Sequence, residues 1–215
     1  MITDFLKKIT TIAFLISLFA GCSPITKSIY GIENPKALSK EKIDHRAKHF
    51  GILVADNFIL DSTYFTFLNK QETTTNKNEV KNHKQPLQAL YFTSNGSVKS
   101  FHINCNASGF PNLDWNRNGI MDTFPPGQQE PVDSLVTLHV LLKFAKVPSQ
   151  HIHAYYEHFD YIVVVVWTNF MGRQTKRFIK TIQQNSKLNS SLRVKLIYLN
   201  ADNLFLQDNF HISEL

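Results

Sequence analysis

This sequence of 215 residues contains little cysteine: the residue occurs twice, as Cys22 and Cys105. Cys22 follows an apolar N-terminal run and, as argued below, is expected to be modified. Cys105 is then the one remaining thiol, so the mature chain cannot form an internal disulfide. Cys105 must be buried, paired between chains, or used chemically.

Dense basic runs and long apolar runs are also missing. The net charge of +6 is spread along the chain, which favours anionic partners only weakly and gives no indication of nucleic-acid binding. The longest apolar run, residues 9–19, is too short to cross a bilayer comfortably. A hydrophobic content of 43% is enough for one ordinary core.

The N-terminus has the pattern of a secretory signal peptide. Lys7 and Lys8 precede the apolar run, and Ala20-Gly21-Cys22 follows it. This end resembles the bacterial lipobox, although Phe19 stands where leucine is usual. The resemblance implies a signal peptide over residues 1–21, acyl chains such as palmitate on Cys22, and a lipid-anchored tether over 22–38. An ordinary cleaved signal peptide or an N-terminal hydrophobic helix is the alternative.

Ser23, and not aspartate, follows the modified cysteine. In lipoproteins this resembles a signal for sorting to the outer membrane, and the resemblance implies the periplasmic face of that membrane. The membrane would then be one partner, held through several acyl chains that together anchor stably.

Residues 39–215 are predicted to form a single domain. We expect helices over 39–49, 61–69 and 131–146, although strand and helix compete over 58–68. Residues 70–85 contain one aliphatic side chain and predict a mobile loop. Residues 104–130, rich in Asn, Asp, Gly and Pro, predict a second loop. The tail from 204 is too short for a further unit.

A β-hairpin is predicted in the middle of the chain. Residues 87–93 and 98–104 have strand composition, and Ser94-Asn95-Gly96 lies between them. Asn-Gly readily supplies the positive φ angles that such a turn requires. Pro86 stands directly before the first strand.

Residues 160–176 are expected to form the centre of the fold. Residues 161–166 are apolar on both faces, as in a parallel strand covered on both sides. Trp167 and a short turn follow, and then a helix. One stripe of this helix is apolar, and the opposite side is basic, with Arg173, Lys176, Arg177, Lys180 and Lys187. A solvated face is the ordinary interpretation of such a stripe, and an anionic lipid surface or acidic partner is the alternative.

This segment resembles the active-site segment of thioredoxins, strand–W–x–x–aromatic–C–G–P–C–helix, with Met171-Gly172-Arg173-Gln174 in place of the cysteine motif. The resemblance implies an α/β fold with a thioredoxin-like mixed sheet flanked by helices. The order of the elements predicts a circularly permuted version (ββα–βαβ) over residues 86–203. The alternative is an unpermuted domain with an early strand at 59–67. The implied site surface consists of Trp167, Phe170, Met171, Gly172, Arg173, Gln174 and Pro86. In thioredoxins a cis-proline precedes the hairpin, so the resemblance implies a cis peptide bond at Pro86.

Residues 114–122 resemble the first nine positions of an EF-hand calcium loop. Asp114, Asn116, Asn118 and Asp122 supply oxygen atoms at positions 1, 3, 5 and 9. Position 12, which normally holds a bidentate glutamate, is Pro125. A weak calcium site is one interpretation, and a loop of Asx turns that bond their own backbone is the other.

The histidines give no clear metal motif. Residues 150–159 are predicted to be an aromatic connector with His151, His153 and His158 exposed, and zinc or copper binding is the alternative. His139 is expected to be a core histidine. No other cofactor is indicated.

Three functions remain open. The first is a non-catalytic, thioredoxin-like lipoprotein that binds a peptide or protein partner through main-chain hydrogen bonds. The second is a thiol-dependent redox enzyme that uses Cys105, with His102 as the nearest base. The third is a calcium-dependent interaction module built on the loop from Asp114 to Asp122.

Overall fold

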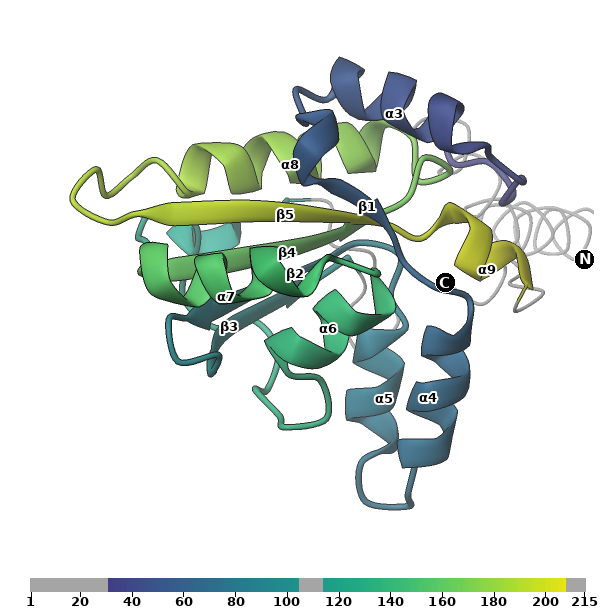
Figure 1. Cartoon of the computed structure of the whole chain (residues 1–215), viewed down its shortest axis with the longest axis horizontal. Helices are drawn as coiled ribbons and strands as arrows, with labels where there is room; N and C mark the ends of the chain where they lie inside the picture. Colours follow the sequence, from purple (N-terminus) through teal and green to yellow (C-terminus); the bar gives the residue numbers. More distant parts are fainter. Residues whose placement is uncertain (1–30, 105–113, 208–215) are drawn as a thin grey trace, which may run out of the picture.

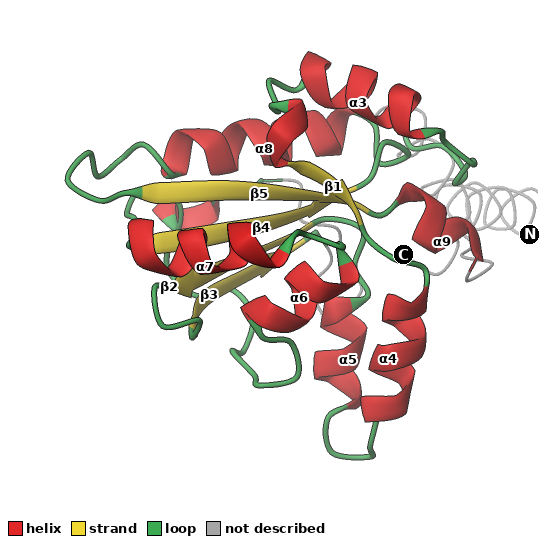
Figure 2. Cartoon of the chain, viewed as in Figure 1, coloured by secondary structure: helices red, strands yellow, loops and turns green. Residues whose placement is uncertain are grey.

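The computed structural model describes residues 31–104 and 114–207, which form a five-stranded sheet with helices on both faces (Figures 1 and 2). The order across the sheet is β1-β5-β4-β2-β3, with β1 at Asn57–Ile59, β2 at Gln88–Thr93, β3 at Val98–Ile103, β4 at Tyr161–Trp167 and β5 at Val194–Asn200. The predicted class, an α/β fold with a mixed sheet flanked by helices, is confirmed.

Strand β4 is the central strand, as its composition predicts. It runs parallel to β5 and antiparallel to β2, and β5 is in turn parallel to β1. Every residue of β4 after Tyr161 is buried. Covering both faces of a strand requires apolar side chains at every position, which explains the run of four valines.

Strands β2 and β3 form the predicted hairpin. The antiparallel pair is closed by a turn in which Gly96 has φ +80° and its N–H donates to the carbonyl of Thr93. A side chain at Gly96 would also meet the ring of Tyr156, about 3.2 Å from an added Cβ. Glycine is therefore required here both by the backbone conformation and by the close approach of a neighbouring helix.

Two layers of helices cover the sheet (Figure 1). Helices α3 (Lys40–His49) and α8 (Arg173–Asn185) lie on one face, and α6 (Leu138–Phe144) and α7 (Ser149–His158) lie on the other. Contacts from β5 agree with this view, because Tyr198 meets Gln183 of α8 whereas Lys195 lies over the ring of Tyr155 in α7. Side chains three positions apart on a strand point to opposite faces.

The prediction of a loop over 70–85 is wrong. Helix α4 (Thr63–Gln71) extends into this segment, and α5 (Lys77–His83) fills much of the rest, the two packing as a pair below the sheet (Figure 1). The buried side chains of α5 include polar ones: Asn82 donates to Glu130 and His83 pairs with Asp133. Because these partners lie 48 and 50 residues away in the sequence, the composition of residues 70–85 does not indicate that Asn82 and His83 are buried.

Helix α4 also excludes the early strand proposed at 59–67. β1 ends at Ile59, and Asp61 then accepts hydrogen bonds from the backbone and hydroxyl of Thr63 at the start of α4. A side chain that bonds the backbone two residues ahead favours the turn into a helix over continued strand. The helical alternative for this segment is therefore the right one.

Two further boundaries differ from expectation. Helix α6 begins at Leu138 and not near Pro131, because Thr137 caps it by accepting from the N–H of Val140. Residues 150–159, expected to be a connector, belong mainly to helix α7. His139 is exposed and not in the core.

Residues 31–38, predicted to belong to the tether, lie against the domain. The N–H of Glu33 donates to the carbonyl of Phe170, and Leu38 exchanges two hydrogen bonds of 2.9 Å with the side chain of Asn203. Ile32 and Leu38 also pack on the core. The predicted signal peptide and Cys22 lie outside the described residues. Among the helices that the structure describes, none is long and apolar enough to span a membrane.

Candidate functional site

The segment that the sequence singles out lies where β4 ends and α8 begins. After Trp167 the chain makes a short turn, and Thr175 in the first turn of α8 donates back to the carbonyl of Thr168 (2.5 Å). Gly172 enters the helix with φ +56° and ψ −121°, a conformation that favours glycine. The carboxyl ends of parallel strands are the usual position of functional sites in α/β proteins.

Asp202 holds this turn in place. Its carboxylate, almost completely buried at the start of helix α9 (Asp202–Gln207), accepts from the N–H groups of Asn169 (2.8 Å) and Phe170 (3.3 Å). It also accepts from the side chain of Asn200 (2.7 Å). Burial raises the pKa of Asp202, and these hydrogen bonds oppose that rise. Asp202 was not identified from the sequence, because it is one of several polar residues that simply mark the end of a strand there.

The implied site surface is not an exposed surface, and this part of the prediction is corrected. Trp167, Phe170 and Met171 are core residues. Gln174 is 3% exposed, and in the part of the chain that the structure describes neither its side-chain oxygen nor its nitrogen has a hydrogen-bond partner. Arg173 alone in this set is exposed. The aromatic rings that follow the strand stabilise the fold, because they fill the space between β4, α3 and α9.

Pro86 lies at the same end of the sheet. Gln88 pairs with Val166, so the residue two positions before Gln88 lies beside the end of β4. Pro86 is buried, and its peptide bond with Gln85 is trans. The sequence therefore placed Pro86 and the turn at one edge of the sheet, but the cis geometry that the resemblance implies is not present.

Several buried polar side chains surround this edge, and of these only Gln174 was predicted from the sequence. Each has an atom without a hydrogen-bond partner among the described residues: Gln85 Oε1, Gln88 Oε1, Asn104 Nδ2, Thr168 Oγ1 and both polar atoms of Gln174. They come from the start of β2, the end of β3, the end of β4 and the start of α8. Because these atoms are buried, a partner does not reach them in this conformation, and amides and hydroxyls of this kind supply no nucleophile.

The chain itself occupies the outer side of the turn. The hydrogen bond from Glu33 N to the carbonyl of Phe170 (2.8 Å) places residues 31–38 across it. An extended segment held by its main chain is the kind of ligand that the resemblance implies for this position. Here that segment belongs to the same chain.

The loop from Asp114 to Asp122 bonds to itself. Asp114 accepts from the N–H of Asn116, and the side chain of Asn116 donates to Asp122 and accepts from the N–H of Met121. Asn118 has φ 60°. These are the Asx turns of the alternative interpretation. The described residues contain no group of three or more His, Cys, Asp or Glu side chains arranged to hold a metal ion.

This loop packs on helix α8. The ring of Trp115 lies 4.3 Å from that of Phe178, and the amide of Asn185 donates to the carbonyls of Met121 and Thr123. The loop therefore covers part of α8, and its turns have a structural role.

Replacing Asn116 with alanine is expected to lower the free energy of unfolding by about 1–3 kcal/mol, because the N–H of Met121 loses its acceptor. Urea unfolding measures this change. Asn118 occupies the neighbouring ligand position and has a positive φ, so Asn118→Gly, which keeps that conformation available, is the matched control and should change stability little. A wild-type stability that rises with millimolar calcium would contradict the structural role and favour a metal site.

Cys105 lies outside the described residues. His102, the base suggested for it, is buried, and burial lowers its pKa to about 4. Its Nε2 atom lies 2.9 Å from the hydroxyl of Ser100. Of the other histidines, His151 and His158 are exposed on α7, as expected.

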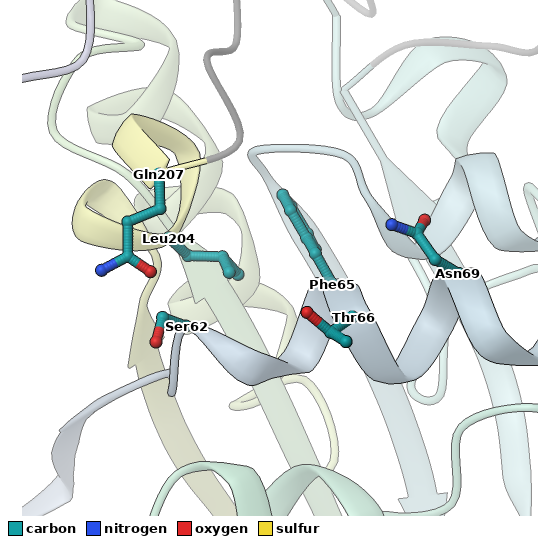
Figure 3. A pocket seen from close by; sticks show the side chains of 6 residues that line it. All are labelled: Ser62, Phe65, Thr66, Asn69, Leu204 and Gln207. Atoms are coloured by element: carbon teal, nitrogen blue, oxygen red, sulfur yellow. The ribbon is translucent and has the colours of Figure 1, made fainter.

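A small hollow opens between α4 and α9 (Figure 3). It measures about 210 Å³ and is lined by Ser62, Phe65, Thr66, Asn69, Leu204 and Gln207. Phe65 and Leu204 contribute the apolar side chains, whereas the remaining residues are polar. A space of this size can admit one side chain of a partner and is smaller than the usual small-molecule site.

No protein-family model matches this sequence, and neither a curated protein nor a solved structure matches the chain. Function must therefore be inferred from the residues and the geometry of the site.

Proposed function

We propose that this chain is a non-catalytic lipoprotein of the cell envelope, anchored through Cys22, whose domain is a circularly permuted thioredoxin-like fold that binds a peptide or protein partner. The proposal is carried by the unit β4–α8–β5, which is joined to the earlier hairpin β2–β3 through pairing of β4 with β2. In thioredoxins the strand–helix–strand half comes first along the chain and the hairpin half second. Here the hairpin β2–β3 comes first and β4–α8–β5 second, as a circular permutation requires.

The chemistry of the turn supports binding over catalysis. Thioredoxin-like oxidoreductases require a thiolate at the start of the helix after the central strand. Met171 and Gln174 occupy these positions here; a thioether cannot ionise to a thiolate, and an amide cannot resolve a mixed disulfide. What the fold offers to a partner is the hollow beside α9, which is lined by polar groups and by the apolar side chains of Phe65 and Leu204.

The lipid anchor is tested by metabolic labelling. The full chain, expressed in a Gram-negative bacterium with an alkyne analogue of palmitate, is expected to become labelled and to sediment with the outer membrane. Cys22→Ser should abolish the label, and Cys105→Ser, the matched control, should keep it. An unlabelled wild-type chain would overturn the anchor.

The partner is tested by photo-crosslinking in the same cells. A photoreactive amino acid at Thr66, which lines the hollow, is expected to give one defined crosslinked product. The same amino acid at Glu157, exposed on α7, serves as the control and should give none. Identical products at both positions, or none at Thr66, would contradict a partner at the hollow.

A further inference from the structure

Two helices account for the net charge of the whole chain. Helices α3 and α8 contain eight of the 23 Lys and Arg residues and two of the 17 Asp and Glu residues. The other 15 basic and 15 acidic residues balance one another. The net charge of +6 is therefore equal to the charge of these two helices, although it looks dispersed along the sequence.

The two helices lie side by side on one face of the molecule (Figures 1 and 2). Gln183 of α8 donates to the carbonyls of Phe50 and Gly51 at the end of α3. Both helices turn their apolar residues inward, and the buried residues include Ile43 and Ala47 in α3 and Phe178, Ile179 and Ile182 in α8. The outward sides of the two helices are therefore neighbours on one side of the domain.

Basic side chains dominate this surface, here called the α3–α8 basic face. It is defined by the exposed residues Lys42, Arg46, Lys48, Arg173, Lys176, Arg177 and Lys180. Within the two helices the acidic residues are Glu41, which is exposed, and Asp44, which pairs with Lys40 and accepts from Asn57. Glu33, which pairs with Lys36, lies near Arg46. Among the residues of these two helices, positive charge thus exceeds negative charge.

The path of the chain brings this face close to the point of attachment. Residues 31–38 lie on the domain and lead directly into α3 at Lys40. The nine steps from Cys22 to Gly31 span at most about 30 Å, even when fully extended. A domain held this near to a membrane can turn toward it the side on which residues 31–38 meet the starts of α3 and α8.

We propose that the α3–α8 basic face docks on the surface of an anionic phospholipid bilayer. Lysine and arginine near such a surface are attracted with about 1 kcal/mol each, over roughly one Debye length. The inference relies on the proposed lipid anchor for its setting in the cell. The affinity of the face for anionic lipid is a separate property and is tested without acyl chains.

The test uses the full chain carrying Cys22→Ser, so that no acyl chain contributes. Its binding to vesicles of phosphatidylcholine is compared with its binding to phosphatidylcholine vesicles that also contain phosphatidylglycerol. Insertion of the N-terminal apolar run contributes to both measurements, and the difference between them reports the electrostatic part. Raising the salt concentration should reduce that difference.

Two variants distinguish an effect of charge on the α3–α8 basic face from an effect of the net charge of the whole chain. K42E/K48E/K176E/K180E reverses four lysines on the basic face, whereas K70E/K81E/K99E/K143E reverses four exposed lysines elsewhere. Both lower the net charge by the same amount. The first should lose at least about tenfold in binding to anionic vesicles, and the second should change by less than about threefold. Circular dichroism confirms that both remain folded.

Equal losses in the two variants, or no loss in the first, would overturn the proposal. Retention of nucleic acid or an acidic polypeptide without binding to anionic vesicles would also overturn it, in favour of a different partner. Failure of palmitate labelling would remove the anchor and leave the vesicle result unchanged, so the two proposals fail separately.

Discussion

Replacing Trp167 with alanine is expected to lower the free energy of unfolding by about 3–5 kcal/mol, the range for a large aromatic residue removed from a core. The indole is 0% exposed at the end of the central strand. Its ring meets that of Phe50 edge-on at 5.7 Å, and its Nε1–H donates to Asn57 (3.2 Å). The substitution would leave a cavity between β4, β1 and α3, and would deprive the buried Asn57 side chain of a donor.

Urea unfolding of three variants checks this expectation. Trp167→Phe keeps most of the apolar volume but removes the N–H donor, so its loss should be clearly smaller than that of Trp167→Ala. Leu188→Ala removes an aliphatic side chain that is 53% exposed and should change stability by less than about 0.5 kcal/mol. A loss below about 1 kcal/mol for Trp167→Ala would mean that the indole does not fill the core as described.

The second large effect is expected at Asp202. Alanine at this position removes the acceptor for the N–H groups of Asn169 and Phe170 and for the side chain of Asn200. Leaving buried donors without a partner costs about 1–3 kcal/mol for each group. Because the charged carboxylate is itself penalised by burial, the net loss of stability should be about 2–4 kcal/mol.

Amide hydrogen exchange distinguishes this role from a general loss of packing. In Asp202→Ala the amides of Asn169 and Phe170 should exchange faster by more than the global loss of stability explains, because the turn opens locally. Asp202→Asn keeps one acceptor oxygen and should retain part of the protection. If both amides stay as protected as β4 in the alanine variant, Asp202 does not hold the turn.

The central half of the fold could be predicted from the sequence because its signals are local. A run of valines predicts a strand buried on both faces, and Asn95-Gly96 predicts a hairpin whose register then follows. The apolar stripe of α8 likewise predicts which side of that helix faces the sheet. Each of these features depends on residues within a few positions of one another.

The errors occur where distant residues determine the outcome. Helix α5 looks like a loop because its buried Asn82 and His83 are satisfied by Glu130 and Asp133, far along the chain. The rings of Trp167 and Phe170 resemble an exposed binding surface in sequence, yet Phe50 and Phe205 cover them. Asp202 could not be identified, because nothing near it shows that Asn169 will lie beside it.

The candidate site divides in the same way. The position of the turn at the end of β4 can be predicted from the local sequence pattern. The Asx turns of the loop that begins at Asp114 can also be predicted, because neighbouring residues form them. The gathering of buried amides from the start of β2, the end of β3 and the start of α8 cannot be predicted in this way, since each glutamine or asparagine alone looks like an ordinary surface residue. The hollow between α4 and α9 equally requires knowledge of how two helices meet.

The hydrogen bonds that join Leu38 to Asn203 have a mechanical consequence. They connect positions 165 residues apart, so the chain leaves the domain beside its last described helix. Tension applied at the N-terminus would reach the contact between Glu33 and Phe170 first and then this pair, before it reached any strand. Under such tension the hydrogen bond of Glu33 would break first and those of Leu38 next. Residues 31–38 would then detach from the domain while the sheet stays folded.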